Sequence, residues 1–289
     1  MKVEILLSAY NGERFIEEQL KSLISQTIKP HIIVRDDGSS DSTEKIITSF
    51  DEIEYIKGEN VGSTESFFLL IDHASECDYY AFCDQDDVWD DDKLEYAISM
   101  LKQYEDIPAI YSSNTRLVDV NLNHIKNENK KPRISLGASI IKNYATGCTV
   151  VFNDKLMKEL KKYHPQNVPY HDWWVNLVCL SIGGVSVFDN NPHISYRQHG
   201  NNVVSGNDSF LKKWKSRIRK FNKPYYRDAM TRQLLDLYKD DISEEGKEVL
   251  QSVADYKTRK IRLIMDDRIQ TGAVLTDLLF RVCVLFNRI

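Results

Sequence analysis

The stretch YYAFCDQDDVWDDD, residues 79–92, decides how the rest of the sequence is interpreted. Its first five residues are apolar or aromatic and predict a buried β-strand. Six carboxylates follow within nine residues, at positions 84, 86, 87, 90, 91 and 92. Such crowding is costly without a cation, and hard divalent ions such as Mg²⁺ or Mn²⁺ take oxygen ligands. The stretch therefore predicts a strand that ends in a metal-binding acidic cluster.

Part of this acidic cluster has a simpler explanation. Asp90, Asp91 and Asp92 directly precede a helical pattern, and negative charge is favoured in the cap and first turn of a helix. We expect these three residues to form the amino-terminal cap and first turn of that helix. Asp84, Asp86 and Asp87 come earlier, and we expect Asp84 and Asp86 to face one metal ion.

The residues before this stretch alternate between short apolar runs and segments of helical period. Strands are predicted at 3–9, 31–35, 53–57 and 79–83, with helices between them at 15–24, 42–50 and 64–74. This alternation is typical of a parallel sheet covered by helices, the α/β class. Ligands of such sheets gather at the carboxyl ends of the strands. Because polar clusters follow three of the strands, at 8–12, 36–41 and 84–87, one pocket is expected to contain all three.

The second half has a mixed pattern that is expected to complete the same sheet. It predicts a polar loop at 121–133 and strands at 148–153 and 185–188. We expect one catalytic domain, 1–206, with a nucleotide-binding half at 1–107 and an acceptor half at 108–206. Strand signals stop beyond it, so 207–289 is predicted to be a helical extension.

Composition narrows the class of protein. The chain has 289 residues and a net charge of −5, which gives no general attraction to nucleic acid. Its five cysteines are odd in number and widely spread, so reduced thiols in a cytosol are expected. No apolar run approaches about 18 residues, so no membrane-spanning helix is predicted.

The stretch DDGSSD, residues 36–41, combines a strand end with a turn. Ser40, Asp41 or Ser42 would be explained as a helix cap, whereas Asp36 and Asp37 sit where carboxylates accept hydrogen bonds from a base or ribose. The chain contains neither a G-x-G-x-x-G fingerprint nor a Walker A loop, which argues against ordinary dinucleotide enzymes and P-loop enzymes.

Five motifs, in order, resemble those of glycosyltransferase family 2, whose members have the GT-A fold: SAYNG at 8–12, the segment 19–27 ending in QT, DDGSSD at 36–41, NVG at 60–62 and CDQDD at 83–87. The resemblance implies a Rossmann-like mixed sheet flanked by helices, and metal-dependent sugar transfer from a nucleoside diphosphate donor. It implies that Ala9, Tyr10 and Asp37 bind the pyrimidine and ribose, and that Asp84 and Asp86 form the D-x-D pair. The nucleotide-sugar site it implies comprises Ser8, Ala9, Tyr10, Asn11, Asp37, Asn60, Gly62, Asp84, Gln85 and Asp86.

The motif HDWW at 171–174 resembles the acidic motif that supplies the catalytic base in inverting members of the family. Asp172 is the candidate base, because an inverting transfer needs a carboxylate to remove the proton of the acceptor hydroxyl. The alternative, that Asp172 caps a helix, is compatible with catalysis. The segment at Gly147 and Cys148 resembles one that lines the acceptor pocket. Trp173 and Trp174 are residues typical of a core, although one of them could line the acceptor cleft.

The motif YRQHGNN at 196–202 departs from the Q-x-x-R-W motif of processive synthases and favours a single addition. Arg197 or His199 could contact the diphosphate or metal, but a lone histidine is as often a structural hydrogen-bonding residue. The predicted metal ligands are therefore Asp84, Asp86, Asp87 and His199. Together with CDQDDVW, the motif resembles the bacterial rhamnosyltransferase branch, which implies dTDP-rhamnose as donor, with a UDP-sugar next.

The carboxyl-terminal part is unusually basic at one place. Residues 212–232 contain nine Lys or Arg and one acid, interleaved with aromatic residues. This composition suits an anionic cytoplasmic membrane surface carrying a lipid-linked acceptor, and equally a helix packed on the core with a solvated basic face. The apolar segment 274–286 suits packing, membrane contact or a homodimer.

Two other functions use part of the same pattern. A nucleotidyltransferase also needs carboxylates, metal and nucleotide, and a silent membrane-bound scaffold could retain the fold. The sequence favours sugar transfer to a glycan or lipid-linked acceptor in cell-surface polysaccharide synthesis, by a cytoplasmic or peripheral membrane protein that binds no nucleic acid.

Overall fold

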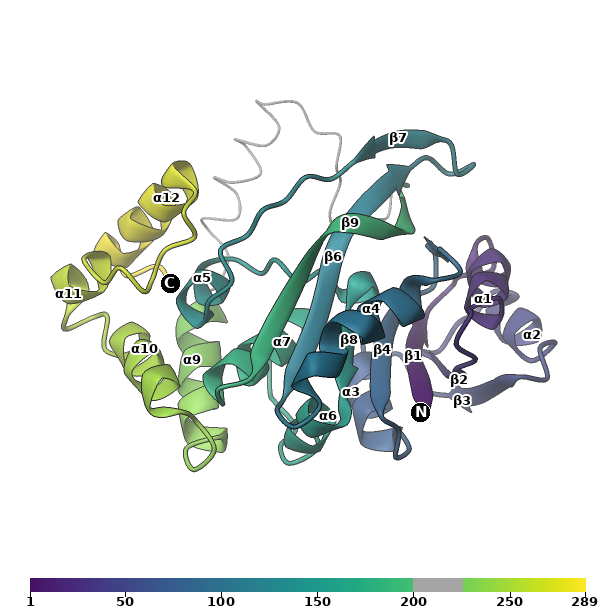
Figure 1. Ribbon diagram of the computed structural model, residues 1–289, viewed down its shortest axis with the longest axis horizontal. Helices are drawn as coiled ribbons and strands as arrows, with labels where there is room; N and C mark the ends of the chain where they lie inside the picture. The colour runs from purple at the N-terminus through teal and green to yellow at the C-terminus, as the bar shows by residue number, and fades with distance from the viewer. Residues whose placement is uncertain (200–225) are drawn as a thin grey trace.

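A computed structural model describes residues 1–199 and 226–289 (Figure 1). The domain boundary expected at 207, and the basic segment as far as residue 225, lie outside the described residues.

The first four strands form the parallel part of the sheet. β1 (Val3–Ala9), β2 (His31–Asp36), β3 (Ile53–Lys57) and β4 (Tyr79–Asp84) pair in the order β3-β2-β1-β4. The connections between them contain α1 (Ile16–Ile24), α2 (Thr43–Ile47) and α3 (Ser63–His73). The predicted strand bounds agree with these to within one residue, and the α/β class is confirmed.

The second half extends this sheet with mixed strand directions. Its elements are β5 (Val88–Trp89), α4 (Lys93–Leu101), β6 (Ala109–Val118), β7 (His124–Asn127), α5 (Leu136–Ile141), β8 (Val151–Asn153), α6 (Asp154–Leu160), α7 (His171–Ser181) and β9 (Val185–Arg197). The order continues β4-β8-β6-β9-β5, and β7 pairs with β6. β8 is antiparallel to both of its neighbours, while β6 and β9 are parallel.

Two sequence predictions in this half were wrong. The strand predicted at 148–153 begins only at Val151, because Gly147–Thr149 form a 3₁₀ turn closed by the Val150 N–H on the Gly147 carbonyl at 2.9 Å. The polar loop predicted at 121–133 contains β7, whose residues are all exposed. Pairing with β6 stabilises that strand, and a local hydrophobic pattern does not reveal such a long-range ladder.

Helices cover both faces of the sheet. α1, α2 and α4 pack on the face that carries Ile5, Leu7 and Cys83. α3, α5, α6 and α7 pack on the opposite face with Leu6 and Phe82. Successive strand residues thus enter different cores, which explains why the strands read as continuous apolar runs rather than alternating ones.

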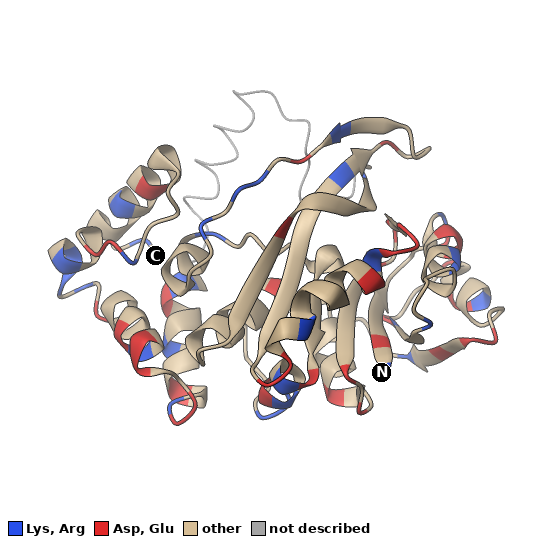
Figure 2. Cartoon of the chain, in the orientation of Figure 1, with Lys and Arg blue, Asp and Glu red and all other residues tan. Residues whose placement is uncertain are grey.

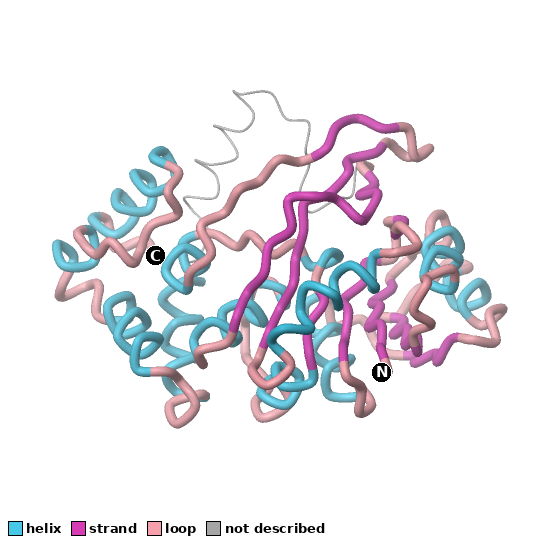
Figure 3. The backbone as a smooth tube through the Cα atoms, viewed as in Figure 1, coloured by secondary structure: helices cyan, strands magenta, loops and turns pink. Residues whose placement is uncertain are grey.

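The described part of the carboxyl-terminal extension is helical: α9 (Tyr226–Leu237), α10 (Glu244–Ala254), α11 (Lys260–Ile264) and α12 (Val274–Leu285) (Figure 3). Leu234, Leu250 and Tyr238 are buried in the same core as Trp174 of α7. These helices and the sheet therefore share one hydrophobic core. None of the described helices is long and apolar enough to cross a membrane, and all five cysteines are free thiols.

Because this core is shared, Leu234→Ala should destabilise the whole chain by about 2–5 kcal/mol. Urea unfolding followed by tryptophan fluorescence and by far-UV circular dichroism should give coincident curves, both shifted to lower urea. Leu278→Ala, on the exposed side of α12, is the matched control and should shift neither curve. Separate transitions for the two probes would show that the extension unfolds independently.

Candidate functional site

A pocket of about 450 Å³ opens where the polar clusters of the sheet meet. Eight of the residues predicted to bind the nucleotide sugar line it: Ser8, Tyr10, Asp37, Asn60, Gly62, Asp84, Gln85 and Asp86. Two others, Ala9 and Asn11, do not. The Ala9 carbonyl accepts the Asp37 N–H at 2.7 Å, and the Asn11 side chain accepts the Ser40 N–H at 2.9 Å. Ala9 and Asn11 therefore hydrogen-bond the loop at residues 37–40 and do not line the pocket themselves.

Gln85 joins the first motif to the acidic one. Its Oε1 accepts the Tyr10 N–H at 2.8 Å, and its Nε2 donates to the Tyr10 carbonyl at 2.9 Å. A Cβ at position 12 would collide with the Gln85 amide, so the close approach requires Gly12. The two hydrogen bonds leave the exposed Tyr10 ring on the rim of the pocket.

Asp37 lines the pocket and holds the loop that precedes α3. Its Oδ2 accepts the Gly62 N–H at 2.9 Å, and its Oδ1 accepts the Val61 N–H at 2.9 Å and pairs with the buried Arg35 at 2.5 Å. Gly62 adopts a φ of 87°, which favours glycine, at the start of α3. The carboxylate thus fixes the loop that carries Asn60, besides lining the cavity.

The acidic cluster concentrates negative charge at the end of β4. Burial, followed by the charges of Asp86 and Asp172, raises the pKa of Asp84 to about 7. Burial and the charges of Asp86 and Asp84 also raise the pKa of Asp87 well above its usual range. Each of these causes disfavours the ionised carboxylate, and a nearby cation would reverse the effect.

An orphaned oxygen supports a cation at this cluster. Asp87 is fully buried, and its Oδ1 accepts the Arg197 N–H at 3.1 Å, whereas its Oδ2 has no hydrogen-bond partner among the described residues. Ligand atoms of Asp84, Asp87 and Cys148 lie within 4.8 Å of one another. Buried polar atoms are normally paired, so an unpaired carboxylate oxygen beside a second carboxylate fits a hard divalent ion.

His199 adds a nitrogen to the same cluster. Its Nε2 lies 2.6 Å from Asp86 Oδ2, and its ring stacks on Phe15. Arg197 is turned away from the pocket. Its guanidinium donates to the Asp86 and Val120 carbonyls and pairs with Glu18. Of the two residues considered for contact with diphosphate or metal, His199 therefore contacts the acidic cluster through Asp86. Arg197 instead holds the backbone of the acidic loop.

Sequence reasoning missed Lys93, a buried cation below the cluster. Its side chain is fully buried, and its Nζ donates to the Cys148 carbonyl at 2.8 Å. Burial lowers the pKa of Lys93 to about 7. A lysine in the first turn of an amphipathic helix is normally solvated, so no local signal pointed to it. Cys148, expected on the acceptor side, also lies in this buried layer.

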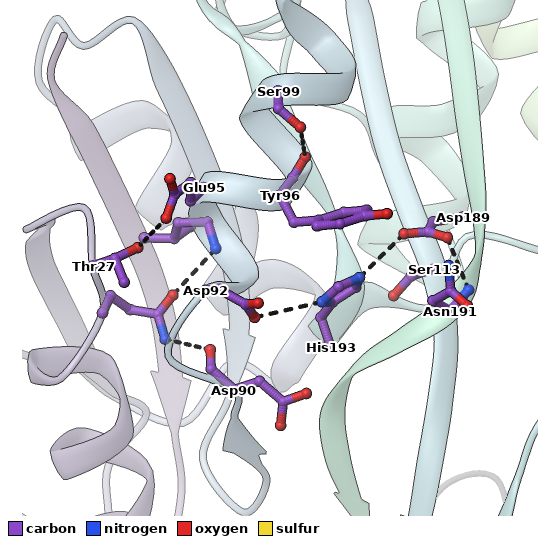
Figure 4. Close-up of polar contacts among 12 residues, drawn as sticks. Thr27, Asp90, Asp92, Glu95, Tyr96, Ser99, Ser113, Asp189, Asn191 and His193 are labelled. Carbon is purple, nitrogen blue, oxygen red and sulfur yellow. Dashed lines mark hydrogen bonds and ion pairs between the residues drawn. The ribbon is translucent and has the colours of Figure 1, made fainter.

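The acids expected at the start of α4 are confirmed in part: Asp92 is its N-cap residue, whereas Asp90 and Asp91 precede the helix. The Asp92 side chain makes no cap hydrogen bond, and its Oδ1 lies 3.6 Å from His193 Nδ1 instead (Figure 4). Gln26 supplies the cap: its Oε1 accepts the Leu94 N–H at 3.2 Å, and its Nε2 donates to the Asp90 carbonyl at 2.8 Å. Gln26 lies 68 positions from Leu94 in the sequence. It can therefore accept the free N–H at the start of α4 only after the chain has folded.

Asp172 reaches the site from the first turn of α7. Its Oδ2 accepts the Gly147 N–H at 2.8 Å, and its Oδ1 accepts the Trp173 N–H at 2.6 Å. The N-cap of α7 is Tyr170, so Asp172 is not the cap of this helix. Burial raises the pKa of Asp172 to about 6. Its carboxylate is only partly covered and is close enough to the acidic cluster for its charge to raise the pKa of Asp84.

The two tryptophans after Asp172 lie in the core. Trp173 and Trp174 are 7% and 1% exposed, and the Trp173 indole donates to the Ser139 carbonyl at 2.6 Å. Neither ring offers a face to an acceptor, and both instead fix α7. Of the residues expected on the acceptor side, Gly147 and Trp173 hydrogen-bond the Asp172 carboxylate, both through their backbone N–H groups.

Comparison with known proteins identifies the class. Residues 4–161 match the model of the family described as glycosyl transferase family 2. The chain belongs to glycosyltransferase family 2. The family expected from the sequence is thus confirmed, and the matched residues contain every part of the pocket except Tyr196. Asp172 and His199 lie beyond the matched residues.

This glycosyltransferase is 32% identical over 244 residues to the dTDP-rhamnosyl transferase RfbG of Shigella flexneri, covering 78% of this chain and 82% of the relative. Its fold is similar to that of S. aureus TarS 1-349 in complex with UDP-GlcNAc, with a TM-score of 0.58, 16% identity, and coverage of 98% of this chain and 90% of the other. It is also similar to the mannosyltransferase PcManGT from Pyrobaculum calidifontis in complex with GDP-Man and Mn²⁺, with a TM-score of 0.55, 15% identity, and coverage of 98% and 80%. These likenesses confirm the GT-A fold.

Asp87→Asn should stabilise the metal-free glycosyltransferase. Folding raises the pKa of Asp87, so the folded state binds a proton that the unfolded chain has lost, and stability falls as the pH rises above about 4. An amide removes this dependence, so thermal melting at pH 7.5 should show a gain of about 1 kcal/mol or more. The stabilisation that the wild type gains from Mn²⁺ should shrink.

Asp51→Asn, an exposed carboxylate outside the pocket, is the control for the loss of one negative charge. A metal-free Asp87→Asn protein that melts below the wild type would show that the buried carboxylate stabilises the fold.

Proposed function

We propose that the protein is an inverting, metal-dependent glycosyltransferase that moves a sugar from a nucleoside diphosphate donor to an acceptor hydroxyl. The observation that carries the proposal is the joint placement of the acidic cluster and Asp172. They come from β4 and α7, 85 or more residues apart in the chain, yet the charge of Asp172 acts on Asp84. An inverting transfer needs a cation beside the leaving diphosphate, which the acidic cluster would hold, and a carboxylate base beside the attacking hydroxyl on the opposite face of the sugar.

The donor occupies the pocket between the first three motifs in this proposal. Tyr10, Asp37 and Asn60 would bind the base and ribose, and Ser8 and Gly62 line the same pocket. The donor sugar is rhamnose from dTDP-rhamnose, with a UDP-sugar as the second candidate. The choice of dTDP-rhamnose is supported by the motif resemblance and by the relative named as a dTDP-rhamnosyl transferase.

Asp84, Asp86, Asp87 and His199 would hold Mn²⁺ or Mg²⁺, because three carboxylates and one imidazole form a suitable donor set. When bound, such an ion offsets the charge of the departing diphosphate. Arg197 holds two of these ligands in place, because its side chain donates to the Asp86 carbonyl and its N–H donates to the Asp87 carboxylate. The mannosyltransferase of similar fold is described in complex with Mn²⁺, which is consistent with this proposal.

Asp172 acts as the general base in this proposal. Its oxygens are oriented by the N–H groups of Gly147 and Trp173, and its raised pKa brings the carboxylate closer to the working pH. It removes the acceptor hydroxyl proton while the new bond forms on the face opposite the leaving group. The acceptor is a glycan or lipid-linked sugar of cell-surface polysaccharide synthesis, presented at the inner face of the cell membrane.

Asp172→Asn should retain metal-dependent donor binding and lose about 10²–10⁴-fold in kcat, the usual contribution of a general base. The assay measures nucleoside diphosphate released from dTDP-rhamnose and UDP-sugars in the presence of Mn²⁺ and candidate acceptors. Asp154→Asn removes another first-turn carboxylate, at the start of α6, and should leave kcat unchanged. Pyrophosphate release by the wild type would indicate nucleotidyl transfer, and failure to bind any nucleotide sugar would indicate a silent scaffold.

Turnover should fall on the acidic side of neutrality with an apparent pKa of about 6, because a protonated Asp172 cannot accept the hydroxyl proton. At saturating Mn²⁺ and donor, kcat measured from pH 5 to 8 should decline about tenfold for each pH unit below that value. The residual rate of Asp172→Asn should lack this limb. An identical limb in the variant would assign the titration to another group.

A further inference from the structure

α11 and α12 lie at one end of the molecule (Figure 1), and several of their apolar side chains are exposed. Ile261 and Met265 of the α11 segment are 74% and 75% exposed. On α12 and its ends, the exposed apolar residues are Val274, Leu275, Leu278, Leu285 and Phe286, with exposed fractions from 42% to 84%. We call these seven residues the α11–α12 face. Clustered exposed apolar residues are costly in water and mark contact surfaces.

The spacing on α12 places these side chains on one side of the helix. Leu275, Leu278, Val282 and Leu285 recur at intervals of three or four residues, while Phe280 and Val284 on the other side are buried in the core. α12 is therefore apolar on both sides, and only its inner side is buried in the core. Lys260 donates from its Nζ to the Leu285 carbonyl at 2.8 Å, so α11 lies against the exposed carboxyl end of α12.

The charge around this face is basic. Residues 257–289 contain seven Lys or Arg and three acids, in a chain whose net charge is −5 (Figure 2). Asp277 accepts the Thr271 and Gly272 N–H groups. Three of the basic residues pair with acids: Lys257 with Asp228, Arg259 with Asp255, and Arg268 with Asp266 and Glu248. Arg281 is exposed beside the apolar stripe, and Arg262 is exposed beside Ile261. The surface is apolar at its centre, with positive charge at its edge.

We propose that the α11–α12 face docks on an anionic lipid surface. Leucine and phenylalanine side chains would enter the boundary between headgroups and acyl chains, and the arginines and lysines would meet the negative headgroups. A second copy of the chain is the less favourable occupant. Isologous pairing through this face would bring basic groups of one copy against those of the other.

The test is co-sedimentation of the full-length protein with vesicles, without donor or metal, so that its outcome is independent of sugar transfer. The wild type should bind vesicles of phosphatidylcholine with phosphatidylglycerol, and bind phosphatidylcholine alone much more weakly. Leu278→Gln with Leu285→Gln should lower the partition coefficient about tenfold or more. Ile107→Gln, an exposed apolar residue in the loop before β6, is the matched control and should bind as the wild type does.

Arg262→Gln with Arg281→Gln should reduce the preference for anionic vesicles while leaving binding to neutral vesicles unchanged. Light scattering of the free proteins completes the experiment. A wild-type dimer that becomes a monomer in Leu278→Gln with Leu285→Gln would assign the face to a second copy and overturn the proposal. Absence of vesicle binding, or binding that the leucine substitutions leave unchanged, would overturn it as well.

Discussion

The accumulation of negative charge at the end of a buried strand is the constraint on which the rest of the site depends. β4 delivers Asp84 and Asp87 into a region where burial opposes ionisation, and Asp86 and Asp172 add further charge. Carboxylates in such surroundings either take up protons or bind a cation. The buried Lys93 offsets part of this charge, but Asp87 Oδ2 remains unpaired. The described residues thus leave part of this negative charge uncompensated, which is consistent with the metal and diphosphate of the proposed function.

Much of the surrounding structure serves to hold this charged loop still. Gln85 is clamped to the Tyr10 backbone, and Arg197 anchors the loop through the Asp86 carbonyl and the Asp87 carboxylate. Gln26 caps the helix that follows. Each contact joins the acidic motif to an element that is distant in sequence. Together these hydrogen bonds hold the motif in one conformation. A fixed loop matters because transfer depends on placing the leaving group and acceptor within a few tenths of an ångström.

The carboxyl-terminal helices combine two physical roles. The inner sides of α9, α10 and α12 close the core behind α7, the helix that carries Asp172. The outer side of α12 remains apolar and exposed. The helix that carries the proposed docking face therefore packs into the same core as the helix that carries Asp172.

Local patterns were sufficient for the first half of the chain. Apolar runs of five to seven residues and helical periodicity determined β1 to β4 and the helices between them, and the ordered motifs located the pocket at the strand ends. Only the tertiary structure decided how the remaining groups act, because their partners are distant in sequence: Lys93 buried under the acids, Gln26 as the cap of α4, and Asp172 held by Gly147. Burial sets the protonation of Asp84, Asp87 and Asp172, and burial is a property of the packed chain, not of any segment of it.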